Sequence, residues 1–264
     1  MTVLLNALVP ASIYNSLPHI HEVSKVPDDH DRDLEHLRGL LAKHKTPKEV
    51  AIRLIHKHFD TRENEVMVFD KMPVPGHGMV QTMRPMQTGN STRLRGIHYF
   101  VDQAGNLQPF EYSNGEAPDM ASIQPFLDDF ARSVAERGLQ HKFGLKLNFD
   151  EDLENTSWNE FEFPQQRSTI MLQDGMPMPA GGFDCEVNTE WKVVFNEYPR
   201  TCKHSTTCKH GNTQCKHCKH CMRHDEAGSQ SQGGLGGDLL LAGQKVLPGT
   251  PIHDIVQAVF LKAH

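Results

Sequence analysis

The stretch RGIHYFVDQAGNLQPFEY, residues 95–112, carries the pattern that decides the fold. Two runs rich in aromatic and β-branched residues, 95–101 and 107–112, flank the short connection DQAGN at 102–106. Runs of this composition are typical of β-strands, and a short connection that contains Gly and Asn favours a hairpin. The stretch therefore predicts two neighbouring antiparallel strands.

Further runs on both sides extend the same sheet. EVMVFD (65–70) precedes the hairpin, and HKFGLKLNF (141–149) alternates apolar and polar residues, which predicts a half-buried strand. FEF (161–163), STIML (168–172) and the alternating run at 187–195 follow. Because the strands arrive in runs, the sequence predicts an α+β fold with a mostly antiparallel sheet and two or three packed helices.

Helical periodicity marks the packed helices. Apolar residues recur on one stripe from Asp31 to Leu41, and again in the clearest helix, 119–137, which Gly138 is placed to end. Thr46-Pro47-Lys48-Glu49 resembles a capping box with Pro at the first helical position, and predicts a helix that continues to Phe59. His56 and His58 would then lie near a helix end, where the helix dipole favours a cation.

A last amphipathic helix begins at Thr250-Pro251. Its apolar stripe must be buried, so we expect the helix to dock on the body, with recognition of a partner as the alternative. The predicted organisation is an irregular lead-in (1–30), the α+β body (31–196), a Cys/His-rich metal-binding segment (197–226), a Gly/Ser-rich linker (227–249) and the C-terminal helix (250–264).

Composition excludes several classes of protein. The chain has 264 residues, 38% of them hydrophobic, which is enough for a core and argues against wholesale disorder. No apolar stretch approaches the roughly 18 residues of a membrane-spanning helix. The first residues carry no Lys or Arg before their apolar run, so no secretory signal is expected. Clustered cysteines favour a reducing compartment, and we expect the protein to be cytoplasmic.

The segment TCKHSTTCKHGNTQCKHCKHCMRH, residues 201–224, concentrates potential metal ligands. Thiolate and imidazole bind zinc in tetrahedral sets of four, and overlapping Cys-x-x-Cys turns allow two thiolates to reach one ion. We therefore predict zinc, with Cu(I) possible because it also prefers soft thiolates. The candidate ligands are Cys202, His204, Cys208, His210, Cys215, His217, Cys218, His220, Cys221 and His224.

Other interpretations of this segment remain open at the level of sequence. It could be a solvated low-complexity tail with no specific metal, or its thiols could serve a redox role. If it binds metal, the spacings permit several ligand pairings. Residues 197–226 carry six Lys/Arg against three Asp/Glu, a net charge of +3. Because the whole chain has a net charge of −6, the rest of the chain carries −9. The basic 200–224 part permits contact with nucleic acid, but residues 202–226 contain no aromatic side chain on which bases could stack. A protein partner is the favoured expectation.

The body contains no known catalytic spacing. It lacks a Gly-x-Ser-x-Gly elbow, a phosphate-binding glycine loop, a dinucleotide fingerprint and a His-Glu-x-x-His pair. Catalytic residues therefore stay unassigned, with His77, His98 and His141 as weak candidates to line a pocket in the sheet. For each of them an ordinary surface or core histidine is the simpler interpretation.

Three stretches carry a resemblance: LIHKHFDTRENEVMVFD (54–70), EYSNGEAPDMASIQPFLDDFARSVAERGLQHKFGLKL (111–147) and the Cys/His run. On these stretches the chain resembles uncharacterised hypothetical proteins of filamentous fungi that have an α+β body and a CKH-repeat tail. The resemblance implies a fungal source and a cytosolic setting, and it carries over no activity.

The leading hypothesis from the sequence is a zinc-binding cytosolic protein that uses the ordered Cys/His segment for protein interaction or regulation. An enzyme of small-molecule metabolism with a pocket in the body is the second hypothesis. A protein that handles Cu(I) or zinc is the third.

Overall fold

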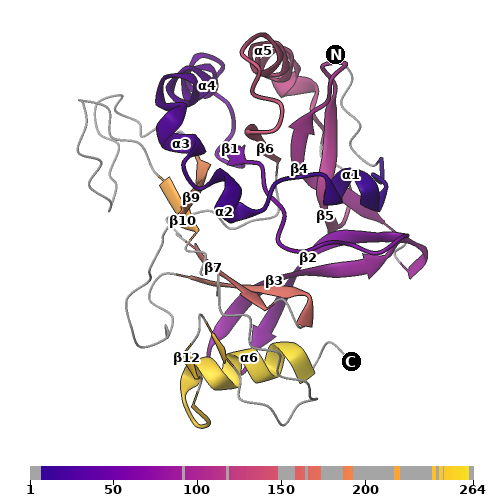
Figure 1. The fold of residues 1–264 in the computed structure, drawn as a ribbon, viewed down its shortest axis with the longest axis vertical. Helices are drawn as coiled ribbons and strands as arrows, with labels where there is room; N and C mark the ends of the chain where they lie inside the picture. Colours follow the sequence, from indigo (N-terminus) through magenta and orange to yellow (C-terminus); the bar gives the residue numbers. More distant parts are fainter. Residues whose placement is uncertain are drawn as a thin grey trace.

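The computed structural model (Figure 1) describes residues 7–90, 93–116, 119–147, 158–163, 166–173, 187–192, 217–220, 240–241, 244–245 and 247–261. Its main feature is one ten-stranded sheet with the strand order β10-β9-β1-β6-β4-β5-β2-β3-β8-β7. The strands are β1 (Val50–Leu54), β2 (Glu65–Val74), β3 (Gly78–Gln87), β4 (Leu94–Val101), β5 (Leu107–Asn114), β6 (Phe143–Leu147), β7 (Trp158–Phe163), β8 (Ser168–Gln173), β9 (Val187–Trp191) and β10 (His217–His220).

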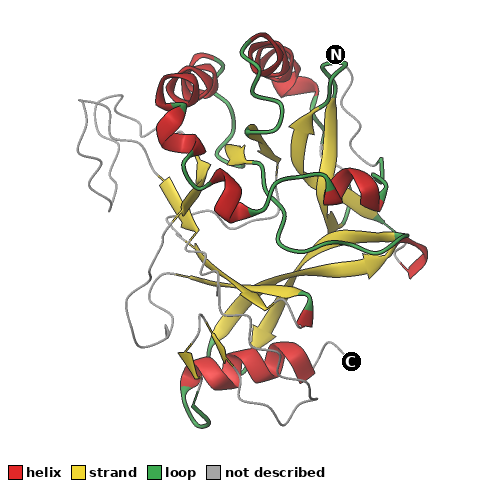
Figure 2. Cartoon of the chain, in the orientation of Figure 1, coloured by secondary structure: helices red, strands yellow, loops and turns green. Residues whose placement is uncertain are grey.

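The sheet is mostly antiparallel, as predicted, with β2 and β5 as its parallel pair. It curls round so far that its two end strands, β10 and β7, come into contact (Figure 2). The sheet therefore has a concave inner face and a convex outer face. The predicted hairpin at 95–112 is confirmed as β4 and β5, which pair in antiparallel register from Leu94–Asn114 to Val101–Leu107.

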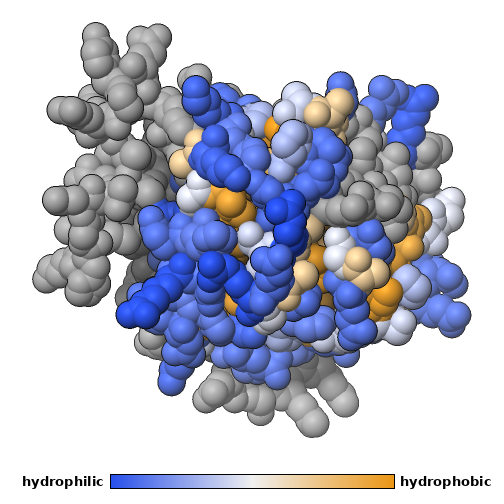
Figure 3. All heavy atoms as spheres, turned by 90° about the horizontal axis from the view of Figure 1, so that it is seen from above, coloured by the Kyte–Doolittle hydropathy of each residue, from blue (hydrophilic) through white to orange (hydrophobic). Residues whose placement is uncertain are grey.

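Helices cover the outer face of the sheet on two sides (Figure 1). The helices α4 (Asp31–Lys43) and α5 (Gln124–Glu136), both predicted from periodicity, pack on β1, β6 and β4 through the largest apolar cluster. Seen from above, the face over these two helices is mainly hydrophilic, with small apolar areas between the polar side chains (Figure 3). A short 3-10 helix, Ala121–Ile123, leads into α5, and another, Thr88–Asn90, follows β3.

The C-terminal helix α6 (Pro251–Leu261) docks on the body, as expected. Its stripe of Ile252, Ile255, Val256, Val259 and Phe260 packs against apolar side chains of β2, β3, β7 and β8. Phe163 and Phe260 meet edge to face, with ring centroids 5.1 Å apart. A small hairpin, β11 (Leu240–Leu241) with β12 (Gln244–Lys245), precedes the helix. Within the described residues, no helix combines the length and apolar composition that a membrane crossing requires.

The expectation of an irregular lead-in is wrong for the described part of residues 1–30. Three short helices lie there: α1 (Ala11–Asn15), α2 (Ile20–Val23) and α3 (Val26–Asp29). Tyr14 and Leu17 are buried in an apolar cluster with residues of the inner face of the sheet, such as Phe69 and Met171. The lead-in therefore packs against the concave side of the sheet.

The predicted helix from Thr46 to Phe59 is also wrong, because residues 50–54 form strand β1. Val50 donates its N–H to the carbonyl of Pro47, 3.0 Å away, so the apparent capping sequence forms a turn. All five residues of β1 are buried, since helices cover one face and the sheet interior the other. A strand buried on both faces shows no alternation, and its periodicity is easily mistaken for a helix.

The half-buried strand predicted at 141–149 is fully buried as β6, including Gly144 and Lys146. A Cβ placed on Gly144 would lie 2.0 Å from the carbonyl oxygen of Tyr99 on the neighbouring strand. The absence of a side chain is therefore what allows β6 and β4 to approach one another here.

We expect Gly144→Ala to lower the free energy of unfolding by about 2–3 kcal/mol, the usual cost of forcing extra atoms into a packed core. Chemical denaturation of both proteins measures the difference. Gly39→Ala is the matched control, because a Cβ on Gly39 meets nothing within 4 Å. Equal stability of the Gly144→Ala variant and the wild type would contradict the close strand contact.

Candidate metal centre

A buried group of three potential metal ligands lies on the inner side of the sheet. His56 and His58 follow β1, and Glu160 lies on β7. One ligand atom from each residue, an imidazole nitrogen or a carboxylate oxygen, lies within 4.8 Å of the other two. All three side chains are buried. The three residues have the composition and proximity to hold a metal ion. They come from two segments that are about a hundred residues apart in the sequence.

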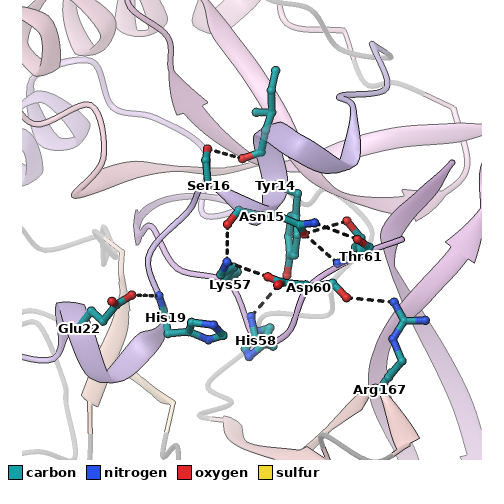
Figure 4. A network of polar contacts seen from close by, with 11 residues as sticks. Tyr14, Asn15, Ser16, His19, Glu22, Lys57, His58, Asp60, Thr61 and Arg167 are labelled. Atoms are coloured by element: carbon teal, nitrogen blue, oxygen red, sulfur yellow. Dashed lines mark hydrogen bonds and ion pairs between the residues drawn. The ribbon is translucent and has the colours of Figure 1, made fainter. Parts of the chain in front are cut away.

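The extended backbone after β1 explains why both histidines face the same side. Alternate residues of an extended chain point to the same face, so His56 and His58 lie together while Lys57 points away. The two imidazole rings are perpendicular, with centroids 5.0 Å apart. The ammonium group of Lys57 instead contacts the carbonyl of Asn15 and lies 2.8 Å from Oδ1 of Asp60 (Figure 4).

The lead-in helix α1 holds this segment through hydrogen bonds of Tyr14 and Asn15 (Figure 4). The side chain of Asn15 accepts a hydrogen bond from the N–H of Thr61 (2.8 Å) and donates one to its carbonyl (2.9 Å). The hydroxyl of Tyr14 accepts a longer hydrogen bond, 3.5 Å, from the N–H of His58. One short helix therefore holds the backbone at His58 and at Thr61, together with the side chain of Lys57.

His56 is arranged as a neutral ligand. Its Nδ1 lies 2.8 Å from the carbonyl oxygen of Leu54, which can only accept, so Nδ1 carries the proton. Burial, with the charges of Arg53 and His58, holds the pKa of His56 well below its ordinary value. Its Nε2 is buried and has no hydrogen-bond partner among the described residues. An imidazole whose Nδ1–H is bound to a carbonyl and whose Nε2 lone pair is left over is the usual state of a metal ligand.

His58 sits between two carboxylates of β7. Its Nδ1 is 2.7 Å from Oε1 of Glu162, and its Nε2 is 3.2 Å from Oε1 of Glu160. Burial acts to lower the pKa of His58, but Glu160 and Glu162 outweigh it and raise that pKa to about 9. The site thus attracts one positive charge between His58 and Glu160, and either a proton or a metal ion can supply it.

Strand β7 directs its carboxylates inward because its other face is covered. Phe161 and Phe163 alternate with Glu160 and Glu162 and pack against α6. The aromatic residues thus occupy the convex face of the sheet, and the charged residues point to its concave side. Glu160 is 0% exposed, and a carboxylate is rarely buried so fully unless it is paired, as Glu160 is with His58.

A belt of further buried charges continues around the inner face. Arg53 of β1 is in register with Glu190 of β9, and their closest charged atoms are 3.7 Å apart. The ammonium of Lys146 on β6 lies 3.1 Å from the carboxylate of Glu190, and that of Lys192 lies 3.4 Å from it. Lys146 is in register with His98 of β4, so the belt extends across four neighbouring strands.

His98 and Glu111 form a buried pair at the end of this belt, where Nδ1 of His98 contacts Oε2 of Glu111. Burial and the charge of Arg53 lower the pKa of His98 to about 4. Burial acts to raise the pKa of Glu111, yet its interactions with His98 and Arg53 hold that pKa below its ordinary value. A neutral His98 then donates through Nδ1, and its Nε2 has no hydrogen-bond partner among the described residues. Such a nitrogen can accept a hydrogen bond from a bound molecule.

The structure separates the three histidines that the sequence offered as catalytic candidates. Only His98, of these three, lies inside the curled sheet, buried beside Phe69 and Phe110. His77 is partly exposed in the turn between β2 and β3, and His141 is exposed just before β6. Of the three candidates, His98 alone is therefore placed to line a pocket inside the sheet, and His77 and His141 are ordinary surface histidines. The interpretation of His56 and His58 as dipole partners of a helix end is wrong, since no helix ends there.

Most of the predicted Cys/His ligands lie outside the described residues. His217, Cys218 and His220 belong to β10, whose backbone pairs with β9, while their side chains are outside the description. Cys202, His204, Cys208, His210, Cys215, Cys221 and His224 lie entirely outside it.

Sequence reasoning missed His56, His58 and Glu160, although two signals for them exist. A His-x-His pair directly after a β-branched run places two imidazoles on one side of an extended chain. The run from Glu160 to Phe163 alternates carboxylates with aromatic residues. What the sequence does not show is that the two runs face each other. No known protein family matches this sequence, and no curated protein or solved structure is significantly similar to it.

We expect Glu162→Gln to weaken Zn²⁺ binding by about 10–100-fold, because a ligand histidine depends on the group that orients its other nitrogen. Chelator competition measures the affinity, in a background where Cys202, Cys208, Cys215, Cys218 and Cys221 are changed to Ser (the five-serine background). Glu63→Gln, an exposed carboxylate nearby, is the control. Equal affinities of both variants would show that Glu162 does not orient His58.

Proposed function

We propose that this chain is an enzyme whose reaction takes place at one divalent metal ion held by His56, His58 and Glu160. The observation that carries the proposal is the buried Nε2 of His56, which lies close to His58 and Glu160 and lacks a hydrogen-bond partner among the described residues. Structural zinc sites are closed by four protein ligands, commonly thiolates. A set of two histidines and one carboxylate leaves coordination positions open, as catalytic sites require.

The donor atoms favour zinc or iron(II) at this centre. Imidazole and carboxylate suit both ions, and the two-histidine, one-carboxylate set is used by catalytic zinc sites and by non-haem iron(II) oxygenases. Cu(I) prefers soft thiolate ligands, so it stays a candidate only for the Cys/His segment.

The surroundings favour a small organic substrate. The inner apolar cluster supplies aromatic and methionine side chains, and the neutral His98 supplies a hydrogen-bond acceptor at Nε2. The ligands are buried, so a macromolecule cannot reach them directly. A small molecule would enter when a covering segment moves. Buried ionisable groups oppose stability unless they are well paired, and their concentration on one inner face supports a functional role.

Nitric oxide tests whether the centre has an open position. The five-serine background is loaded with Fe²⁺ under anaerobic conditions and then treated with nitric oxide. We expect the EPR signal of an iron–nitrosyl complex, and no such signal when His56 is changed to Ala. Stoichiometric iron without a nitrosyl signal would mean a closed, structural centre and would contradict the proposed enzyme.

The Cys/His segment is a second proposed function, supported by its ligand density and by the pairing of β10 with β9. We propose that residues 202–224 bind zinc and present a surface to a protein partner in the cytosol. Metal handling and contact with nucleic acid are the competing proposals for this segment. Loss of a second equivalent of zinc in the five-serine background would support it, and unchanged zinc content would contradict it.

A further inference from the structure

Arg53 presents an unsatisfied edge of its guanidinium group inside the curled sheet. The side chain is 1% exposed. Its Nη1 lies 3.4 Å from Oγ1 of Thr189 and 3.7 Å from Oε2 of Glu190. Its Nε and Nη2 are buried and have no hydrogen-bond partner among the described residues. Nε–H and the adjacent Nη2–H point in the same direction, so the unsatisfied edge is the one that binds a carboxylate through both oxygens.

The unsatisfied donors on this edge of Arg53 lower the stability of the fold unless a ligand accepts their hydrogen bonds. Arginine does not lose its proton in proteins, so Arg53 cannot avoid the cost of burial by becoming neutral. Buried donors that lack acceptors oppose folding, so each one in a native structure calls for an explanation, such as a bound ligand or a functional role.

Strand pairing places Arg53 beside the metal ligands and the belt of buried charges. Arg53 precedes His56 on the same run of chain and is in register with Gly144 of β6 and Glu190 of β9. Lys146 of β6, whose ammonium lies close to Glu190, is in register with His98, the partner of Glu111. The lowered pKa values of His98 and Glu111, to which the charge of Arg53 contributes, agree with this placement.

A charge count indicates the sign of the missing ligand, and this step rests on the proposed metal centre. Seven charged residues of the metal centre and the belt, four carboxylates and three cations, carry formally −4 and +3. A divalent ion changes the sum to +1, with the histidines neutral. The residues counted are Glu111, Glu160, Glu162, Glu190, Arg53, Lys146 and Lys192. One monoanion would balance the loaded site, whereas a phosphate dianion would exceed it.

We propose that Arg53 is the recognition residue for a substrate carboxylate, and that the enzyme acts on a small monocarboxylic acid. The two carboxylate oxygens accept hydrogen bonds from Nε and Nη2 of Arg53, and the remainder of the acid packs against the inner apolar cluster. Phe69 and Phe110, which contact His98, supply aromatic surface on this side.

Calorimetric titration of the full chain with acetate and benzoate tests this proposal. Acetamide and benzamide are the uncharged controls of the same shape, and ionic strength is held constant with chloride. We expect at least one acid to bind about 100-fold more tightly than its amide, since hydrogen bonds to charged groups contribute about 1.5–3 kcal/mol. Equal binding of acid and amide, or no binding of either acid, would overturn the proposal without any variant.

Arg53→Lys keeps a positive charge beside Glu190 and removes the pair of parallel N–H donors that binds both oxygens of a carboxylate. We expect this variant to lose about 100-fold in acid affinity, the same factor, while its Zn²⁺ affinity stays within a few-fold of the wild type. Arg95→Lys, a buried arginine of β4 whose Nη1 bonds the carbonyl of Glu116, is the matched control and should bind the acid normally.

Metal-free protein separates this inference from the metal centre. One outcome is that the chain binds no Zn²⁺ at His56, while acid binding still requires Arg53. This result would contradict the proposed function and support the Arg53 site. Zn²⁺ binding without acid binding would do the reverse. Acid binding that needs Zn²⁺ and survives Arg53→Lys would place the carboxylate on the metal and overturn the role of Arg53.

Discussion

Replacing His56 by alanine is expected to lower the Zn²⁺ affinity of the five-serine background by at least about 1000-fold. This exceeds the roughly 10–100-fold effect of groups that only orient a ligand. The reason is that, of the two histidines in the ligand group, His56 is the one that is already neutral, and its buried Nε2 has no hydrogen-bond partner among the described residues. Chelator competition and elemental analysis of the untagged protein measure the loss.

His141→Ala is the matched control, because His141 is an exposed histidine just before β6. It should leave zinc affinity unchanged. Since His56→Ala also removes buried volume, its metal-free thermal unfolding is recorded beside the background protein. His56→Gln fills more of the space and should fail to bind zinc as well. Stoichiometric zinc in both His56 variants would place the ion elsewhere.

Zinc is also expected to stabilise the fold strongly. At a free Zn²⁺ concentration about 1000 times the Kd, ligand linkage raises the free energy of unfolding by about 4 kcal/mol. The effect is specific to the folded state because the end of β1 and β7 are far apart in the sequence, and the unfolded chain has no preformed site. Denaturant titration of the five-serine background with and without zinc measures the gain.

The gain should vanish in His56→Ala and should reverse when a chelator is added. A protein that is equally stable with and without zinc, although elemental analysis finds zinc bound, would mean that the ion also binds the unfolded chain. That result would contradict a site assembled by folding.

Secondary structure is predicted most reliably from the sequence where one face of a helix or strand packs on an apolar surface and the other face is exposed. The helices α4, α5 and α6 each place one stripe against one sheet surface, so their period is visible in the sequence. The strands of the β4–β5 hairpin are neighbours in the sequence, and the Gly and Asn of the turn between them are recognisable as turn residues. The prediction is wrong at strand β1 because helices cover its outer face and the curled sheet encloses its inner face. Both faces are therefore apolar or buried, and the alternation of apolar and polar residues is lost.

The metal centre was not predictable for a different reason. An alternation such as Glu160-Phe161-Glu162-Phe163 is normally interpreted as carboxylates in water and aromatic residues in a core. Here the curled sheet encloses the carboxylates, and α6 covers the aromatic residues. Which strands of such a sheet face one another depends on long-range pairing that no local pattern encodes. The Cys/His run, whose ligands are adjacent in sequence, is visible for the opposite reason.

An anomalous difference map tests the central claim most directly. Crystals of the five-serine background, grown with zinc, are measured on both sides of the zinc absorption edge. We expect one peak about 2.0–2.2 Å from Nε2 of His56, Nε2 of His58 and a carboxylate oxygen of Glu160. An interior without a peak between these side chains, in crystals that contain excess zinc, would contradict the account.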